Sequence, residues 1–174
     1  MNETGGQPVP YARPLLDAVA LFDELAIRYA LVGGVASMYY GRARFTEDLD
    51  FVAHSGHRDV FDRNGDAMRR HGFDPTCSWK LYHETGVEID LCKDEFSDQI
   101  VQRAVEVELV GRRVRIAEPH DLIAMKLRAG RLQDDYDISE ILRGPRAIDD
   151  TVVKERVTPD QFAHYLSIKQ RANP

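Results

Sequence analysis

The sequence has few cysteines, no long apolar run and no excess of basic residues. Its 174 residues include two cysteines, Cys77 and Cys92, which are too few for a disulfide framework or a thiolate metal site. The first residues, MNETGGQPVPYARP, are polar and lack the apolar region of a signal peptide. No uninterrupted apolar stretch approaches the ~20 residues that a membrane span needs. We therefore expect a cytoplasmic protein with reduced thiols and no membrane partner.

The charge is acidic overall and unevenly distributed. The formal net charge is −6, and residues 1–100 hold 17 acidic and 10 basic side chains, against 12 and 13 in residues 101–174. Binding to DNA in general depends on a basic surface that releases counterions from phosphates, so this composition argues against it. An acidic site neutralised by a divalent cation remains compatible with the first part. A local basic patch for an RNA acceptor remains compatible with the second, from Arg112, Arg113, Arg115, Lys126, Arg128 and Arg131.

The order of the expected elements places an α/β core before a helical C-terminal part. Residues 1–13 contain Gly, Pro and polar residues and predict a flexible arm. Residues 14–117 predict the core, which includes two strand hairpins turning at Thr85-Gly86 and Gly111-Arg112. Residues 118–174 predict a helical extension packed on the core. The other expected core elements are a helix from Pro14, a strand at 29–32, a short helix ending at Gly41, a strand around 48–51 and an amphipathic helix over 57–73, capped by Gly72.

Two aspartates on one predicted strand are the main chemical signal. Residues two apart on a strand point to the same face, so Asp48 and Asp50 would converge on one point. Two carboxylates that close repel each other unless a cation lies between them, and Mg²⁺ prefers oxygen ligands. The pattern favours a metal site over a solvent-facing strand with scattered acids, because aspartate is poorly suited to strands.

Two further short patterns lie near this pair. Gly33-Gly34 follows an apolar strand and precedes a short helix, which allows backbone N–H groups to approach a phosphate; a simple tight turn is the alternative. Glu88 and Asp90 share one face of a later strand. If that strand lies beside the first, one of these two acids could complete a three-carboxylate cluster, and their spacing does not separate them.

Taken together, these motifs resemble those of a known enzyme family. LVGGVASMYYGRARFTEDLDF and the later PHDLIAMKLRAGRLQDDYDI are similar to the minimal bacterial nucleotidyltransferases of the polymerase-beta-like superfamily, which include abortive-infection toxins and antitoxin-like relatives. The resemblance covers roughly residues 15–143. It implies an α/β (α+β) fold with a mixed β-sheet nucleotidyltransferase core, flanked by helices and followed by the C-terminal helical extension.

The resemblance also implies roles for individual residues. Asp48, Asp50 and Asp90 correspond to the catalytic carboxylates that hold the metal, Mg²⁺ or Mn²⁺. The corresponding nucleotide-binding residues are Gly33, Gly34, Ser37, Arg44 and Lys126.

Several of these residues have a plainer interpretation. Ser37 could bond its own helix backbone, Arg44 could balance Glu47, and Lys126 could be a surface lysine. The acids at 134, 135 and 137 are interpreted as a solvated helix face. His120-Asp121 is similar to the metal dyad of HD phosphohydrolases, but after Pro119 it is better interpreted as a helix start.

The function that the resemblance implies is metal-dependent transfer of a nucleotidyl group from a nucleoside triphosphate. The acceptor would be a hydroxyl of a protein, an RNA or a small molecule, in a toxin–antitoxin system with a cognate toxin or antitoxin partner. Two alternatives stay open. One is a partner-binding, antitoxin-like protein of the same fold with little or no catalysis, and the other is an enzyme that modifies aminoglycoside-type antibiotics.

Overall fold

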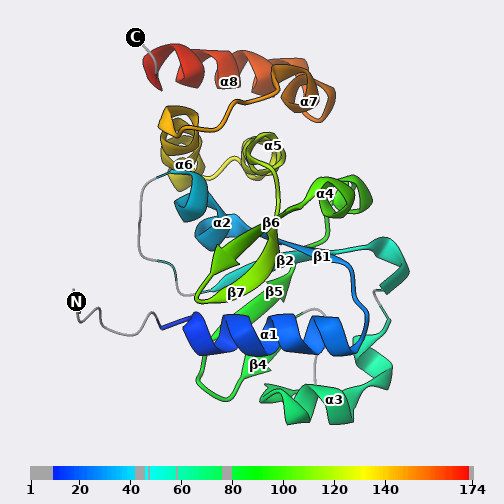
Figure 1. Ribbon diagram of the computed structural model, residues 1–174. Coiled ribbons are helices and arrows are strands. Elements are labelled where there is room, and N and C mark those ends of the chain that lie inside the picture. Colours follow the sequence, from blue (N-terminus) through cyan, green and yellow to red (C-terminus); the bar gives the residue numbers. More distant parts are fainter. Residues whose placement is uncertain (1–9, 42–45, 47, 58, 76–79, 173–174) are drawn as a thin grey trace, which may run out of the picture.

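A mixed β-sheet forms the centre of the molecule, with helices on both of its faces (Figure 1). The computed structural model describes residues 10–41, 46, 48–57, 59–75 and 80–172. The elements within those ranges are α1 (Ala12–Glu24), β1 (Tyr29–Val32), α2 (Gly33–Tyr40), β2 (Leu49–Ala53), η1 (Ser55–His57), η2 (Phe61–Arg63), α3 (Gly65–Arg70), β3 (Phe73–Asp74), β4 (Lys80–His83), β5 (Glu88–Leu91), α4 (Ser97–Arg103), β6 (Val105–Leu109), β7 (Arg112–Ile116), α5 (Pro119–Ala129), α6 (Leu132–Arg143), α7 (Asp150–Glu155) and α8 (Pro159–Ala172).

The strand order across the described part of the sheet is β3-β4-β5-β2-β1-β7-β6. β1 runs antiparallel to β2, whereas β7 joins β1 and β5 joins β2 in parallel. The two hairpins, β4–β5 and β6–β7, are antiparallel. These pairings confirm the α+β fold with a mixed sheet, and both predicted hairpins are present. The parallel pairing of β2 with β5 brings together two strands that are separated in the sequence.

The two faces of the sheet have different partners. On one face, Phe22 of α1 packs against Tyr29 of β1 and Phe51 of β2, with ring centroids 5.0 and 5.1 Å apart. On the other face, α2 packs on β1 and β2, and α5 and α6 pack on α2. Residues alternate between the faces along a strand, so Asp50 lies on the face opposite Phe51. The polar residues of β2 therefore face α2 and α5.

The C-terminal helices are tied to the core through a buried aspartate. Asp121, in the first turn of α5, is fully buried and pairs with Arg103 of α4 at 2.6 Å. It also pairs with Arg156, which directly follows α7. The position of Asp121 confirms that His120-Asp121 opens a helix, with Pro119 in its first turn. Because a buried charge that loses its partner is costly, this cluster holds α4, α5 and α7 in fixed positions.

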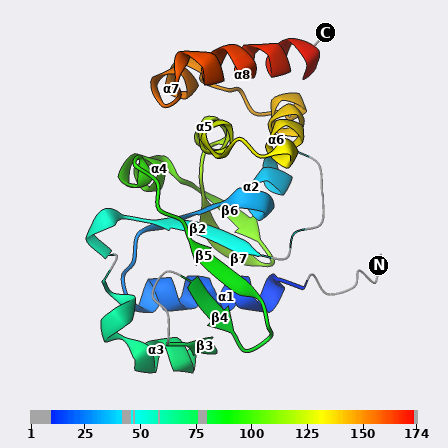
Figure 2. The same cartoon turned by 180° about the vertical axis from the view of Figure 1, so that it is seen from behind.

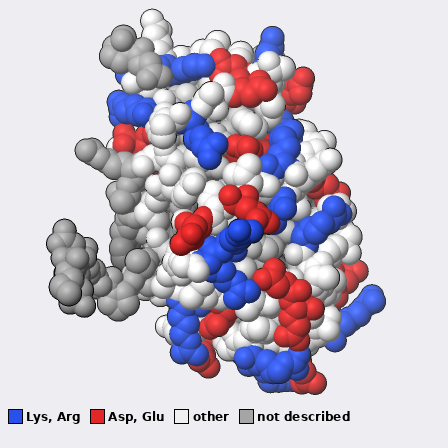
Figure 3. Space-filling model, viewed as in Figure 1, with Lys and Arg blue, Asp and Glu red and all other residues white. Residues whose placement is uncertain are grey.

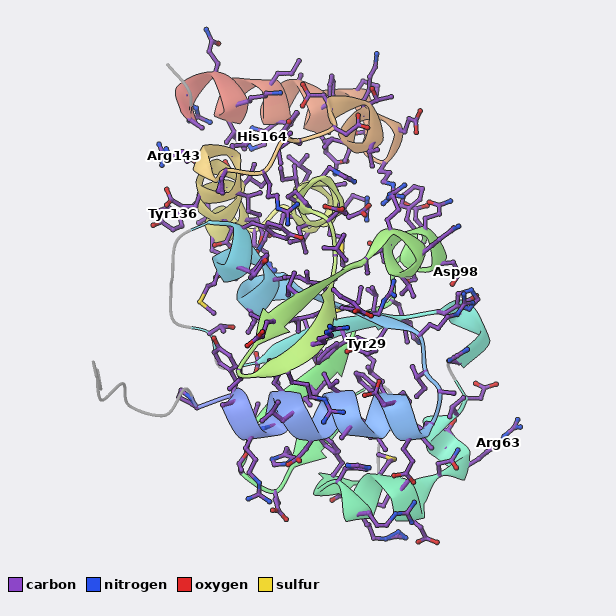
Figure 4. The ribbon with its side chains drawn as sticks, in the orientation of Figure 1. Tyr29, Arg63, Asp98, Tyr136, Arg143 and His164 are labelled. Atoms are coloured by element: carbon purple, nitrogen blue, oxygen red, sulfur yellow. The ribbon has the colours of Figure 1, made fainter. Side chains whose placement is uncertain are left out.

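The outermost helices, α7 and α8, lie at one end of the molecule (Figure 2). His164 of α8 lies next to α6 (Figure 4), where its ring contacts the Asp135 carboxylate at 2.8 Å. None of the helices in the described ranges is both long and apolar enough to span a bilayer.

One predicted helix is wrong, and other elements were not predicted. Residues 57–73 do not form a single helix, because the chain turns at Asn64, whose φ and ψ are −126° and 39°, between η2 and α3. Asn and Gly are poor helix residues, and the Asn64-Gly65 pair breaks the helix here. The first helix begins at Ala12 rather than Pro14. β3, α4 and α7 were not predicted from the sequence. The start of α4 is held by a contact with a distant segment, because Asp98 in its first turn accepts hydrogen bonds from the Ser55 amide and hydroxyl (Figure 4).

The end of α1 gives a stability prediction. Ile27 N–H donates to the Phe22 carbonyl at 2.8 Å and Ala26 N–H to the Asp23 carbonyl at 3.2 Å, which is a Schellman motif. Ala26 has φ 53°, a region that glycine adopts without a Cβ penalty. Ala26→Gly should therefore raise the free energy of unfolding by roughly 0.5–1 kcal/mol, as measured by urea denaturation.

The matched control is the same substitution inside α1. Ala20→Gly should lower the free energy of unfolding by roughly 0.5–1 kcal/mol, because glycine is a poor residue in a helix interior. A loss of stability in both variants would contradict this account of the Ala26 cap.

Candidate functional site

One row of residues crosses four adjoining strands and contains the candidate carboxylates. Val32 of β1 is the Cα partner of Asp50 of β2, and Asp50 is the partner of Asp90 of β5. Asp90 is in turn the partner of Lys80 of β4. Partners in register share a face of the sheet. The structure thus brings Asp50 and Asp90 together on the face that carries α2, next to a lysine at one end and Gly33 at the other.

The glycine turn is in direct contact with Asp50. Gly33 has φ +64°, and a Cβ at this position would lie 1.8 Å from Oδ2 of Asp50. The next amide, that of Gly34, donates a hydrogen bond to the Asp50 carboxylate. A side chain at position 33 would therefore displace the aspartate. Gly33 and Asp50 act as one packing unit, which joins the first motif of the sequence to the second.

The surroundings of Asp50 disfavour the ionised form of its carboxyl group. Burial raises the pKa of its carboxyl group, and the nearby carboxylates of Asp90 and Asp48 raise it further. The Gly34 hydrogen bond and the positive charge of Arg131 act in the opposite direction. Crowded carboxylates of this kind bind a divalent cation favourably, because the cation removes their repulsion.

Asp48 lies at the edge of this group. It is exposed and comes immediately before β2, which begins at Leu49. Its carbonyl accepts a hydrogen bond from the Thr46 hydroxyl at 3.4 Å. The strand is thus one residue shorter at this end than the alternation predicts, although the Asp48 charge still acts on Asp50.

Lys80 distinguishes the two candidates on β5. Its ammonium group lies 2.5 Å from Oε2 of Glu88 and 3.4 Å from Oδ1 of Asp90. The hydrogen bond with Glu88 is the main reason that the pKa of Lys80 lies above its usual range. Asp90 is in register with Asp50 and lines the same pocket. Glu88 lies two residues before Asp90 on β5, and its carboxylate pairs with the Lys80 ammonium group. This geometry favours Asp90 as the third carboxylate.

A pocket of about 330 Å³ lies between the strand row and the start of the C-terminal helices. Its walls come from three separate parts of the chain, namely Val32, Gly33 and Asp50, then Asp90 and Cys92, and finally Leu122, Met125, Lys126, Ala129 and Arg131.

Lys126 reaches this pocket, but it is not a surface lysine. It is 5% exposed, and its ammonium group lies 2.6 Å from Oδ2 of Asp137 and 3.4 Å from Oδ1 of Asp134. The interpretation of the acids on α6 as a solvated face is wrong for Asp134 and Asp137, which are 1% and 4% exposed. Both turn inward because their carboxylates pair with the buried lysine.

Arg131 is a pocket residue to which the sequence analysis assigned no role in the site. Its amide and its Nε each donate a hydrogen bond to Oδ2 of Asp134 at 3.0 Å. Its positive charge acts to lower the pKa of Asp50. The only signal in the sequence was an arginine between two helical segments.

Cys92 is a second pocket residue that was not predicted from the sequence. Its Sγ lies 3.9 Å from Oδ1 of Asp50, and burial raises the pKa of its thiol to about 12.

The remaining predicted residues are placed as follows. Ser37 is buried and its hydroxyl donates to the Gly33 carbonyl at 2.7 Å. This bond confirms the alternative interpretation of Ser37 as a residue that bonds its own helix, and a nucleotide contact stays a prediction. Arg44 lies outside the described residues.

The fit of this arrangement to a divalent cation lies in its donor chemistry. Among the residues that the structure describes, no three His, Cys, Asp or Glu side chains are close enough to hold a metal ion as they stand. The donor chemistry fits, because Asp50, Asp90 and Asp48 supply carboxylate oxygens whose mutual repulsion raises the pKa of Asp50.

Three of the six basic residues named for a local basic patch are paired with acids. Arg112 pairs with Asp23, Arg128 with Asp94, and Lys126 is buried between two aspartates. On the face drawn in Figure 3, Lys and Arg side chains lie among Asp and Glu. The positive charges of these three residues are therefore offset by neighbouring carboxylates.

Comparison with known proteins gives a family. The family described as "Nucleotidyl transferase AbiEii toxin, Type IV TA system" matches residues 15–171. No curated protein matches the sequence.

Solved nucleotidyltransferase structures share the fold. An antigenic nucleotidyltransferase-like protein from Paracoccidioides brasiliensis is 20% identical, with a TM-score of 0.55, over 94% of this chain and 88% of that one. Lincosamide antibiotic adenylyltransferase LnuA, bound to lincomycin, is 16% identical, with a TM-score of 0.50, over 73% and 93%. ANT(2")-Ia in complex with adenylyl-2"-tobramycin is 15% identical, with a TM-score of 0.51, over 94% and 99%. Because the family matches most of the chain and the fold agrees with it, the protein belongs to the AbiEii nucleotidyltransferase toxin family.

Proposed function

We propose that this protein transfers a nucleotidyl group from a nucleoside triphosphate to a hydroxyl group, with a divalent cation held by Asp48, Asp50 and Asp90. The observation that carries the proposal is the register of β2 and β5, which places Asp50 beside Asp90 and against the Gly33-Gly34 turn. When bound, Mg²⁺ or Mn²⁺ would offset negative charge on the reacting phosphate. The carboxylates fix the position of that charge relative to the glycine turn.

The pocket walls have separate roles in this proposal. The Gly33-Gly34 turn opens α2 and presents backbone to the pocket, so it would lie closest to the phosphates. Arg131 and Lys126 come from the opposite wall. Asp134 contacts both cations and would hold them in position for the negatively charged pyrophosphate that leaves.

The acceptor hydroxyl belongs to a protein, an RNA or a small molecule. Membership of a toxin family described as type IV supports a place in a toxin–antitoxin system and a cognate antitoxin as partner. Incubation with each α-labelled nucleoside triphosphate and a cell extract, with and without Mg²⁺, tests the proposal. Transfer of label to one class of macromolecule or to a small molecule only with Mg²⁺ is expected, and the absence of any labelled product for every triphosphate would contradict a catalytic function.

Neutralising Asp50 should separate activity from stability. Asp50→Asn keeps the shape and an acceptor for the Gly34 amide, but removes a charge that burial and two neighbouring carboxylates disfavour. The free energy of unfolding in EDTA should rise, because a raised carboxyl pKa means that the ionised form destabilises the folded state at neutral pH. Metal-dependent nucleotide binding and label transfer should fall on the order of 100-fold or more.

The control is Asp59→Asn, an exposed aspartate in a turn outside the helices and strands, which should leave both properties unchanged. The companion variants Asp48→Ala and Asp50→Ala should abolish label transfer. Calorimetry that shows unchanged binding of Mg²⁺-nucleotide in both would disprove the assignment.

Gly33→Ala should remove activity by moving Asp50. The new Cβ would overlap the carboxylate, since the ideal position lies 1.8 Å from Oδ2. Gly111→Ala is the matched control, because Gly111 has a similar φ of +74° but nothing lies within 4 Å of its Cβ. Both variants should lose about 1–2 kcal/mol from backbone strain, as measured by denaturation. Only Gly33→Ala should lose label transfer per folded molecule, and equal activity in the two variants would contradict the coupling.

A further inference from the structure

The β4–β5 half of the sheet leaves the lysine of the strand row accessible. Lys80 and Tyr82 lie on the same face as Glu88 and Asp90, two residues apart on each strand. Tyr82 is 43% exposed, and the side chains of Lys80 and Asp90 are 35% and 36% exposed. In the view of Figure 2, β4 lies away from α2 and α5. A cation or a metal-bound water can therefore reach this side of Asp90.

Among the residues that the structure describes, the acids of the row outnumber its bases. In the pocket wall formed by α5 and α6, the positive charges of Lys126 and Arg131 are neutralised by the carboxylates of Asp134 and Asp137. β2, the residue before it and β5 contribute four carboxylates, those of Asp48, Asp50, Glu88 and Asp90, and β4 contributes one ammonium group, that of Lys80.

This imbalance determines how many divalent cations the site accommodates. With Lys80 in place, one divalent cation leaves a single negative charge, and a second cation would reverse the sign of the cluster. Without Lys80, two divalent cations would balance the four carboxylates. The Lys80 ammonium lies 3.4 Å from Oδ1 of Asp90, a distance at which its repulsion of a cation on the same carboxylate is strong.

We propose that Lys80 takes the place of a second divalent cation, so that the nucleotide-free protein binds one such ion, beside Asp50. Lys80 is thus a positioning residue that engages Glu88 and one oxygen of Asp90. This inference rests on the proposed function, because it presumes that the carboxylates bind a metal ion.

Counting bound Mn²⁺ tests the proposal without measuring activity. The full-length protein is titrated with Mn²⁺ in the absence of nucleotide, and free Mn²⁺ is followed by electron paramagnetic resonance. One ion per chain is expected for the wild type and for Lys80→Arg, which keeps the positive charge. Two ions per chain are expected for Lys80→Met and for Lys80→Gln, and the first should bind at least tenfold more tightly than in the wild type.

Two further variants make the result specific. Lys154→Met removes a positive charge from an exposed position on α7 and should behave like the wild type. Asp50→Asn should lose the single wild-type ion. Two ions on the wild type, or one ion on both neutral Lys80 variants, would overturn the role of Lys80 and leave the proposed function intact. A wild type that binds no Mn²⁺ in the absence of nucleotide would overturn this inference, and the Mg²⁺ dependence of label transfer would test the proposed function separately.

Discussion

The carboxylate of Asp50 occupies the space that a side chain at position 33 would fill, and it does so beside a second carboxylate. Burial and like charge both disfavour this arrangement, so the surrounding structure has to impose it. The parallel pairing of β2 with β5 fixes the distance between the acids, and the left-handed Gly33 makes room for one of them. The aromatic contacts of Phe51 on the opposite face hold β2 in place.

The parts of the site that are local in sequence could be predicted. Gly33-Gly34 lies at a strand-to-helix turn and Asp50 on β2, as turn chemistry and strand alternation predict, whereas Asp48 precedes the strand. The third carboxylate depends on a contact between distant strands. Glu88 and Asp90 have the same spacing and the same face, so only the register and the position of Lys80 distinguish them.

The parts that could not be predicted depend on contacts between elements. Asp134 and Asp137 have the composition of a solvated helix face, yet they are buried because Lys126 of the preceding helix pairs with them. Arg131 gains its place in the pocket from the same group. The mistaken helix over residues 57–73 has the opposite cause, since its apolar spacing was correct but Asn64-Gly65 outweighed it locally.

The three walls of the pocket also lie in a definite order along the chain, at residues 32–50, 90–92 and 122–131. A chain leaving the ribosome displays the glycine turn and the first two aspartates long before its cationic wall has been made. Until Arg131 has emerged, the carboxylates face no arginine or lysine from α5 and α6 that could attract a triphosphate. Chains that end before Arg131 therefore lack one wall of the pocket.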